Sequence, residues 1–382
     1  MKSRRRSKTR SASEKKSAFS LEKIFLFTTV FLSILGLFFI FEASTTESYR
    51  LVGHQYHFLK QQSIALFLGL IALFVTQKWP FSFWQKTAGL WFIAGLTLLF
   101  LVLIPGFGIE LNGAKRWFVL GGRVFQPVEF FKFTLILFSA NWMSKNPKPQ
   151  TFLFFTGLFS LLLLLQPDMG SLLILLWIVF GMFFLAGGHL GFLAGVSSLG
   201  IGLLVIAILS SSYRFQRVTT YLDPAKDPLG AGFHIRQITL ALGHGGWFGV
   251  GIGNSQQKHA YIPEASSDSI FAIVAEEMGF VGATVILSIM IFYVFLIYKI
   301  ASSLPERSFE QLLVFGIFLW FGGQILLNIS AVVALVPLTG LPLPFFSYGG
   351  TSLLMTLVAT GVLLGAVRNQ KARLPSRIRK KV

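Results

Sequence analysis

The stretch MGSLLILLWIVFGMFFLAGGHLGFLAGVSSLGIGLLVIAILSSSY, residues 169–213, carries no Asp, Glu, Lys or Arg and decides the fold class. A transmembrane helix needs about 20 consecutive apolar residues, so this stretch is long enough to cross a membrane twice. The two crossings are separated at AGGHLG, residues 186–191, where three glycines interrupt the apolar run. A pair of adjacent spans of this kind predicts a polytopic membrane protein built from helices.

The composition of the whole chain excludes a soluble enzyme, because 54% of its 382 residues are hydrophobic and only 13% are charged. The formal net charge is +18, but 16 of the 33 Lys and Arg lie before residue 24 or after residue 366. Because the excess is terminal, we expect no nucleic-acid partner. The chain has no Cys, which excludes disulfide bonds, thiolate zinc sites and a cysteine nucleophile.

Apolar stretches of similar length recur along the chain and predict an all-α integral membrane protein with about ten transmembrane helices. The expected spans are residues 24–42, 61–77, 87–105, 126–144, 150–166, 169–187, 190–210, 269–298, 311–335 and 350–367. The first span is too long for the apolar core of a signal peptide, so we interpret it as a retained signal anchor. The membrane domain then covers residues 24–367, between a basic, disordered cytoplasmic tail at 1–23 and a basic cytoplasmic tail at 368–382.

The distribution of Lys and Arg between alternate loops predicts the orientation of these spans. The side that holds both termini carries 22 of these residues and the opposite side carries 10, so both termini are expected in the cytoplasm. The segment at residues 211–268, between the seventh and eighth spans, then forms a large extracytoplasmic loop. Residues 106–125 and the Pro-rich turn at 337–348 lie on the same side. We therefore expect the chemistry on the extracytoplasmic side.

Charged residues inside the predicted spans need a reason, because each costs about 2.5 to 3.5 kcal/mol on insertion scales. Glu129 and Lys132 are one helical turn apart in the fourth span and are expected to pair. The pair either fixes the register of the helix or orients a lipid-linked substrate. Glu276 and Glu277 lie about two turns inside the eighth span, roughly 12 Å at 1.5 Å per residue, and at least one must face the other helices as a counter-ion.

Two cations precede the fourth span on the outer side. Lys115 and Arg116 stand beside Trp117, at the level expected for anionic lipid head groups. Arg116 is a candidate phosphate clamp, because a guanidinium offers paired donors to phosphate oxygens; ordinary snorkelling at the interface is the alternative. Asp168, in the tight turn between the fifth and sixth spans, is expected to be the N-cap of the following helix.

The large outer segment holds the best candidate for a catalytic base. Residues 234–242 have the apolar pattern of a short helix along the membrane interface. Further on, Asp268 stands at the mouth of the eighth span, where a carboxylate is partly desolvated yet accessible. This position suits a general base, and capping of the eighth helix is the alternative.

Six motifs, in this order, resemble the FtsW/RodA family of shape, elongation, division and sporulation proteins across nearly the whole chain. They are GAKRWF at 113–118, QPVEFFK at 126–132, QPDMGS at 166–171, GVGIGNSQQK at 249–258, PEASSDSIFAIVAEEMG at 263–279 and LPFFSYGGT at 343–351. The fourth and fifth motifs look more like the division branch, FtsW, than the elongation branch, RodA. Three positions depart from the family pattern: Val128 and Thr351 stand where Ser is usual, and Ser269 stands where Phe usually follows the Asp.

The resemblance implies a peptidoglycan glycosyltransferase that polymerises lipid II into glycan strands at the outer face of the bacterial cytoplasmic membrane, during septal wall synthesis. It implies a class B penicillin-binding protein and other division-complex membrane proteins as partners, and a divalent cation, Mg²⁺ or Mn²⁺. Asp268 falls on the family's proposed catalytic Asp. Glu129 and Lys132 match the family's intramembrane charged pair, and Arg116 matches its loop arginine.

Such a polymerisation needs a base, positive charge for the leaving pyrophosphate, and two lipid-anchored reactants held in line. Asp268 is assigned the first task, and outer-loop cations are assigned the second. The candidate substrate contacts are Arg116, Lys115, Arg214, Arg217, Arg236, Lys258 and Glu264, the last also being the nearest alternative base. The protein ligands of the cation are not assigned.

Two other functions are compatible with ten spans that contain charged residues. A lipid II flippase needs substrate contacts from both faces, whereas the long polar segment of this chain lies on one. A scaffold that only recruits a class B penicillin-binding protein would tolerate substitution of Asp268.

Overall fold

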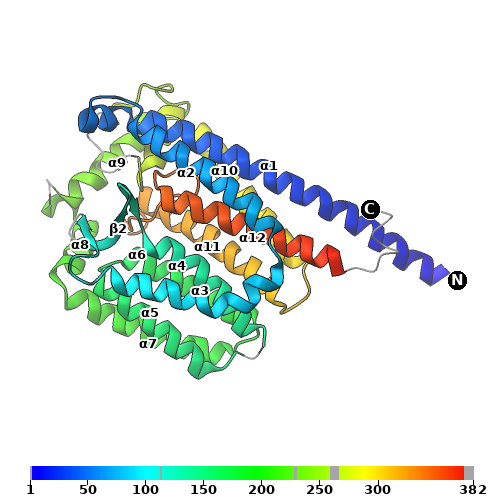
Figure 1. The fold of residues 1–382 in the computed structure, drawn as a ribbon. Coiled ribbons are helices and arrows are strands. Elements are labelled where there is room, and N and C mark those ends of the chain that lie inside the picture. Colours follow the sequence, from blue (N-terminus) through cyan, green and yellow to red (C-terminus); the bar gives the residue numbers. More distant parts are fainter. Residues whose placement is uncertain (1, 112–113, 146, 228–229, 259–265, 374–382) are drawn as a thin grey trace.

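The computed structural model describes residues 2–111, 114–145, 147–227, 230–258 and 266–373, and in this part of the chain ten long helices form a bundle (Figure 1). They are α1 (Lys2–Val52), α2 (His57–Lys78), α3 (Phe81–Leu101), α4 (Pro127–Met143), α5 (Pro149–Leu165), α6 (Met169–Leu185), α7 (Leu190–Leu209), α10 (Ile270–Ser302), α11 (Phe309–Val332) and α12 (Gly350–Arg373). Each overlaps one predicted span, which confirms the mainly helical fold.

Six of the described helices are long and apolar enough to cross a membrane, namely α1 from Leu21 onward, α2, α7, α10, α11 and α12. The helices α5 and α6 are apolar but shorter. The chain is therefore a multi-pass membrane protein. That all ten long helices cross the membrane stays a prediction.

Local sequence signals explain several helix starts. Pro127 and Pro149 occupy the first turns of α4 and α5, where the missing N–H costs no hydrogen bond. Asp168 Oδ1 accepts a hydrogen bond from Ser171 N at 3.1 Å, which confirms Asp168 as the N-cap of α6. Ser308 Oγ caps α11 in the same way.

The loop before α4 folds into a small antiparallel sheet that the sequence analysis did not predict. Its strands β1 (Ile109–Leu111), β2 (Ala114–Leu120) and β3 (Arg123–Phe125) lie in the order β1-β2-β3. The turn between β2 and β3 is Gly121-Gly122, with φ of 57° and 74°. Two successive positive φ angles characterise the hairpin turn whose twist matches the flanking strands. These strands are too short to show in the apolar pattern, and they leave the mainly helical fold unchanged.

Helix α10 is broken at Gly279 (φ 68°, ψ −174°), although the sequence predicted one continuous span. In a continuous helix Phe280 N would donate to the carbonyl four residues earlier, that of Glu276. Instead, Phe280 N donates to Gly246 O at 2.9 Å, and Glu276 O accepts from Val250 N at 3.0 Å. A second pair of bonds repeats this exchange one residue further along: Val281 N donates to Trp247 O, and Gly251 N donates to Glu277 O. The segment 246–251 therefore satisfies the backbone groups that the break releases.

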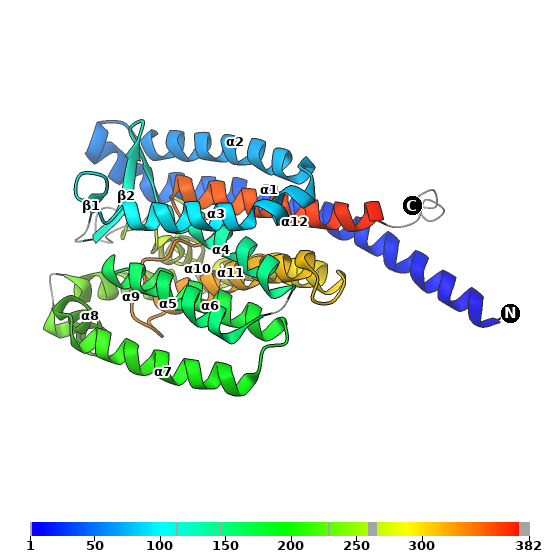
Figure 2. The same cartoon turned by 60° about the horizontal axis from the view of Figure 1, so that its bottom comes forward.

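The two ends of the bundle differ. The amino end of α1 and the carboxyl end of α12 project from one end, and the sheet lies at the other with α8 (Ser212–Leu222) and α9 (Ala231–Gly245) (Figures 1 and 2). The short helix η1 (Pro224–Lys226) joins α8 to α9. The helix α9 confirms the short helix predicted at residues 234–242.

The basic segment at residues 1–23 was predicted to be disordered, whereas α1 is drawn as one helix from Lys2 (Figure 1). The first described side chain that packs against the bundle is that of Leu21. The limits of the tails and of the membrane domain stay a prediction.

Candidate active site

Asp268 lies two residues before the start of α10, at the end of the bundle that also carries α8 and α9. Its backbone is held from two directions. Asn328 Nδ2 in α11 donates to Asp268 O and to Leu341 O, both at 2.8 Å. From the Pro-rich turn, Tyr348 N donates to Ser266 O at 2.7 Å. The base candidate therefore stands on a fixed backbone, with a side chain that is only partly buried.

The residue at the N-cap position of α10 is Ser269, so the structure does not place Asp268 in the capping position that was its alternative assignment. Ser269 Oγ lies 3.3 Å from Asp268 Oδ1. A Cβ atom placed on Gly340 would lie 4.0 Å from Asp268 Oδ2, so this oxygen lies beside the Pro-rich turn. The role of Asp268 as a base stays a prediction.

The Pro-rich turn is itself fastened to the helices around it. Ser347 Oγ accepts from Leu343 N at 2.6 Å and donates to Ser267 O. The Tyr348 hydroxyl donates to Gln61 Oε1 in α2. Burial, with the nearby charge of Glu47 as a second cause, raises the pKa of Tyr348 above its ordinary value. Tyr348 is therefore a neutral hydrogen-bond donor at physiological pH.

Glu129 and Lys132 form the ion pair that the sequence predicted, with Lys132 Nζ 2.7 Å from Glu129 Oε1 and both side chains buried. Lys132 Nζ also donates to Gln324 Oε1 at 2.9 Å. That same oxygen accepts from Trp320 Nε1, and Gln324 Nε2 donates to Pro342 O at 2.6 Å. The pair thus joins α4 to α11 and to the Pro-rich turn, which favours the packing role over the substrate role.

Glu276 and Glu277 are both buried, and each faces the other elements rather than lipid. Glu276 accepts from the hydroxyl of Ser255 and from Gln256 N at 3.2 Å, and its Oε1 lies 3.7 Å from His244 Nδ1. Glu276 therefore binds side-chain and backbone groups of the outer segment that precedes α10, and Glu277 binds Lys258 of the same segment.

Lys258 belongs to the same buried group. Its Nζ lies 3.1 Å from Glu277 Oε1 and 3.5 Å from Glu42 Oε2 in α1. Its side chain is almost fully buried, so its donors serve protein carboxylates. The predicted contact of Lys258 with substrate stays a prediction.

Two of the arginines predicted to bind phosphate meet at the carboxyl end of α5. Arg116 donates to Gln166 O at 3.1 Å and to Pro167 O, and lies 3.9 Å from Asp168 Oδ1. Arg214 donates to Leu164 O at 2.6 Å. Guanidinium groups stabilise the unpaired carbonyls and negative dipole end of a helix. The structure thus turns these donors toward the protein, and their binding of phosphate stays a prediction.

The remaining candidate substrate contacts are Arg217, Arg236, Lys115 and Glu264. Arg217 and Arg236 are exposed on α8 and α9, and Arg217 Nη1 reaches Leu338 O at 3.5 Å. Lys115 lies on β2, opposite Glu110 of β1. Glu264 lies outside the described residues.

Replacing Asp168 is expected to affect folding more than catalysis. Asp168→Ala removes the hydrogen bond to Ser171 N and the nearby charge of Arg116, and loss of an N-cap costs about 1 kcal/mol. The yield and melting temperature of the purified protein should fall, while the activity per folded molecule stays near that of the parent. A stable but inactive variant would instead assign Asp168 to the reaction.

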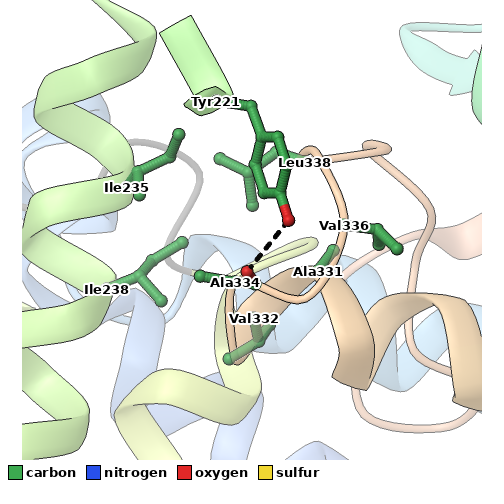
Figure 3. A pocket seen from close by; sticks show the side chains of 8 residues that line it. All are labelled: Tyr221, Ile235, Ile238, Ala331, Val332, Ala334, Val336 and Leu338. Atoms are coloured by element: carbon green, nitrogen blue, oxygen red, sulfur yellow. Dashed lines mark hydrogen bonds between the residues drawn. The ribbon is translucent and has the colours of Figure 1, made fainter. Parts of the chain in front are cut away.

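A small apolar pocket lies between α8, α9 and the end of α11 (Figure 3). Ile235 and Ile238 line it from α9, Tyr221 lines it from α8, and the remaining lining residues belong to the segment 331–338. The Tyr221 hydroxyl donates to Ala334 O at 3.3 Å and Leu335 O at 2.8 Å. The pocket offers no charge, so it serves to pack the outer helices and does not suit a sugar or phosphate.

For the divalent cation implied by the resemblance, the structure bears only on a cluster of three or more protein ligands. Among the described residues, no group of three His, Asp or Glu side chains is placed to bind one ion. Hard cations of this kind are often held by substrate phosphates with few protein oxygens. No catalytic step is assigned to a protein-bound metal.

The sequence did not point to Asn328, Gln324 and Ser347 as residues that support the site. Asn328 and Ser347 bind the backbone at Asp268 and Ser267, and Gln324 binds the backbone of the Pro-rich turn. The available signal was a polar side chain in an apolar membrane helix, since such residues are costly unless they bind a partner. Asn328 and Gln324 are both of this kind, in α11.

The comparisons with known proteins agree over most of the chain. A family model described as cell cycle protein, for FtsW, RodA and SpoVE, matches residues 22–372. A Thiomicrospira cyclica protein named probable peptidoglycan glycosyltransferase FtsW is 37% identical over 342 residues, which cover 86% of this chain and 87% of the relative. Stage V sporulation protein E of Bacillus subtilis is 36% identical over 359 residues, which cover 91% of this chain and 97% of the relative.

A solved structure described as structural coordination of polymerization and crosslinking by a peptidoglycan synthase complex is similar in fold. Its TM-score is 0.75 at 30% identity, covering 91% of this chain and 97% of that chain. The match of the family model to more than nine tenths of the sequence and the identity to these relatives lead to one conclusion: the chain belongs to the FtsW/RodA/SpoVE family.

Proposed function

We propose that this protein is a peptidoglycan glycosyltransferase that polymerises lipid II at the outer face of the bacterial cytoplasmic membrane, with Asp268 as general base. The observation that carries the proposal is the partly buried Asp268 carboxylate on a backbone fixed by Asn328 and the Pro-rich turn. The names of the relatives as probable peptidoglycan glycosyltransferases support the same activity, and the FtsW name supports a septal role.

In the proposed reaction, Asp268 accepts the proton of the GlcNAc 4-hydroxyl of one lipid II. The oxygen attacks the anomeric carbon of the MurNAc of a second lipid II, and the bond to undecaprenyl pyrophosphate breaks. A general base must lie within about 2.6 to 3.2 Å of the oxygen whose proton it takes. The fixed backbone of Asp268 helps to hold its carboxylate at such a distance from the GlcNAc 4-hydroxyl. The exposed cations Arg217 and Arg236, with Lys115, supply positive charge for the leaving pyrophosphate.

The proposed partners are lipid II, a class B penicillin-binding protein and other membrane proteins of the division complex. A divalent cation, Mg²⁺ or Mn²⁺, is proposed to reach the site with the pyrophosphate rather than in a cage of protein ligands. The description of the similar solved structure as a peptidoglycan synthase complex supports an assembly of this kind.

Purified protein with labelled lipid II tests the activity, with and without a class B penicillin-binding protein whose transpeptidase is blocked. We expect linear glycan strands that depend on added Mg²⁺ or Mn²⁺. Transport of lipid II across a vesicle membrane without strands would instead support a flippase. Recruitment of the penicillin-binding protein without either activity would support a scaffold.

The proposed orientation, with both termini cytoplasmic, is testable with single cysteines because the chain has none of its own. Cysteine in place of Gln256 or Gln216, both exposed at the end away from the termini, should react with an impermeant thiol reagent on intact spheroplasts. Cysteine in place of Glu306, in the loop between α10 and α11, is the matched control and should react only after lysis. The reverse pattern of labelling would invert the orientation.

A further inference from the structure

The residue after Asp268 connects the carboxylate to α9. Ser269 is fully buried, and its Oγ lies 3.3 Å from Asp268 Oδ1 and 2.8 Å from His234 Nε2. The three side chains form a continuous row of hydrogen-bonding groups from α9 to the candidate base.

We propose that His234 and Ser269 are positioning residues that orient the Asp268 carboxylate as a base, an inference that rests on the proposed function. An ionised carboxylate only accepts hydrogen bonds, so Ser269 directs its single hydroxyl proton to Asp268 Oδ1. The Ser269 oxygen then accepts from His234 Nε2–H. The direction of both bonds is therefore fixed by the charge on Asp268.

Orientation matters because the backbone bonds of Asp268 do not fix the rotation of its carboxylate. Asn328 holds the main chain of Asp268, whereas the bond from Ser269 holds Oδ1. The helix α9 in turn fixes His234, because Ile238, one turn further along, is buried in the core. A small displacement of a catalytic group costs a large factor in rate, since reacting atoms must be aligned at about 3 to 3.5 Å.

The test uses the full-length protein in the lipid II assay, with kcat and KM measured separately. His234→Phe keeps an aromatic ring but removes both ring nitrogens, and His234→Gln places an amide donor near the position of Nε2. Ser269→Ala removes the hydroxyl. The matched control is His189→Phe, which changes an exposed histidine in the connection between α6 and α7. Protein yield and melting temperature are recorded for each variant.

We expect His234→Phe and Ser269→Ala each to lower kcat about tenfold, the effect of one lost hydrogen bond, with KM nearly unchanged. His234→Gln should recover most of the rate. The double variant His234→Phe/Ser269→Ala should be no slower than Ser269→Ala alone, because both changes break one row.

Three results would overturn the positioning role of His234 and Ser269 while leaving the proposed function standing. They are a parental kcat in His234→Phe, effects on kcat that multiply in the double variant, and a His234→Gln variant as slow as His234→Phe. If the parent protein forms no glycan strands, the proposed function fails, and the positioning role of His234 and Ser269 fails with it. The separate measurement of melting temperature identifies a variant whose rate falls only because it is unfolded.

Discussion

Asp268→Asn is expected to abolish strand formation while the protein remains folded and continues to bind lipid II. Asn keeps the shape of the side chain and most of its hydrogen bonding but removes the charge that accepts the proton. Loss of a positioned general base commonly lowers the rate by a factor of about 100 to 10,000. Single-turnover conversion of labelled lipid II by the purified variant measures this loss.

The matched control is Asp227→Asn, which removes another carboxylate of the outer segment, one that accepts from Gly230 N at 3.0 Å. This variant should polymerise at nearly the parental rate. The contrary outcome is a purified Asp268→Asn protein as active as the parent, which would move the base elsewhere, with Glu264 the nearest alternative.

Lys132→Met is expected to lower the stability of the folded protein severely. Removing one partner of a buried ion pair typically costs about 3 to 5 kcal/mol, because the remaining charge is left uncompensated. Glu129 is particularly sensitive, since its Oε2 has no hydrogen-bond partner among the described residues and Lys132 supplies the bond to Oε1. The melting temperature in detergent and the amount of protein in the membrane should both fall.

Lys299→Met is the matched control, because Lys299 is exposed near the end of α10, where its Nζ lies 5.1 Å from the centroid of the Phe295 ring. This substitution should leave the melting temperature almost unchanged. Glu129→Gln combined with Lys132→Met should restore part of the lost stability, because no charge is then left unpaired. A Lys132→Met protein as stable as the parent but inactive would instead assign Lys132 to the substrate.

The features that the sequence predicts well are those set by local physics. The helices follow from the length of uncharged apolar runs, the Glu129–Lys132 pair from spacing along one helix, and the cap at Asp168 from its place before an apolar run. The position of Asp268 at the mouth of α10 follows from the boundary between polar and apolar sequence.

The features that escape prediction depend on contacts between distant parts of the chain. Arg116 carries the same charge whether it binds a phosphate or the carbonyls of α5, and only the fold decides between them. Gly279 lies in an apolar run like many other glycines, and its role is set by the approach of Gly249. Gln324 and Asn328 of α11 donate to the carbonyls of Pro342 and Leu341 in the Pro-rich turn. These bonds form only because the chain after α11 folds back against that helix.

The break in α10 makes the outer segment and the membrane bundle a single cooperative unit. Four backbone hydrogen bonds join residues 246–251 to the broken helix, and each unsatisfied group at membrane depth would cost several kcal/mol. Cutting, transplanting or unfolding the outer segment at this point would therefore leave the backbone groups of α10 on both sides of Gly279 without partners. Chimeras between relatives should retain their own residues 246–251 together with their own α10, and hydrogen exchange should protect the two regions to the same degree.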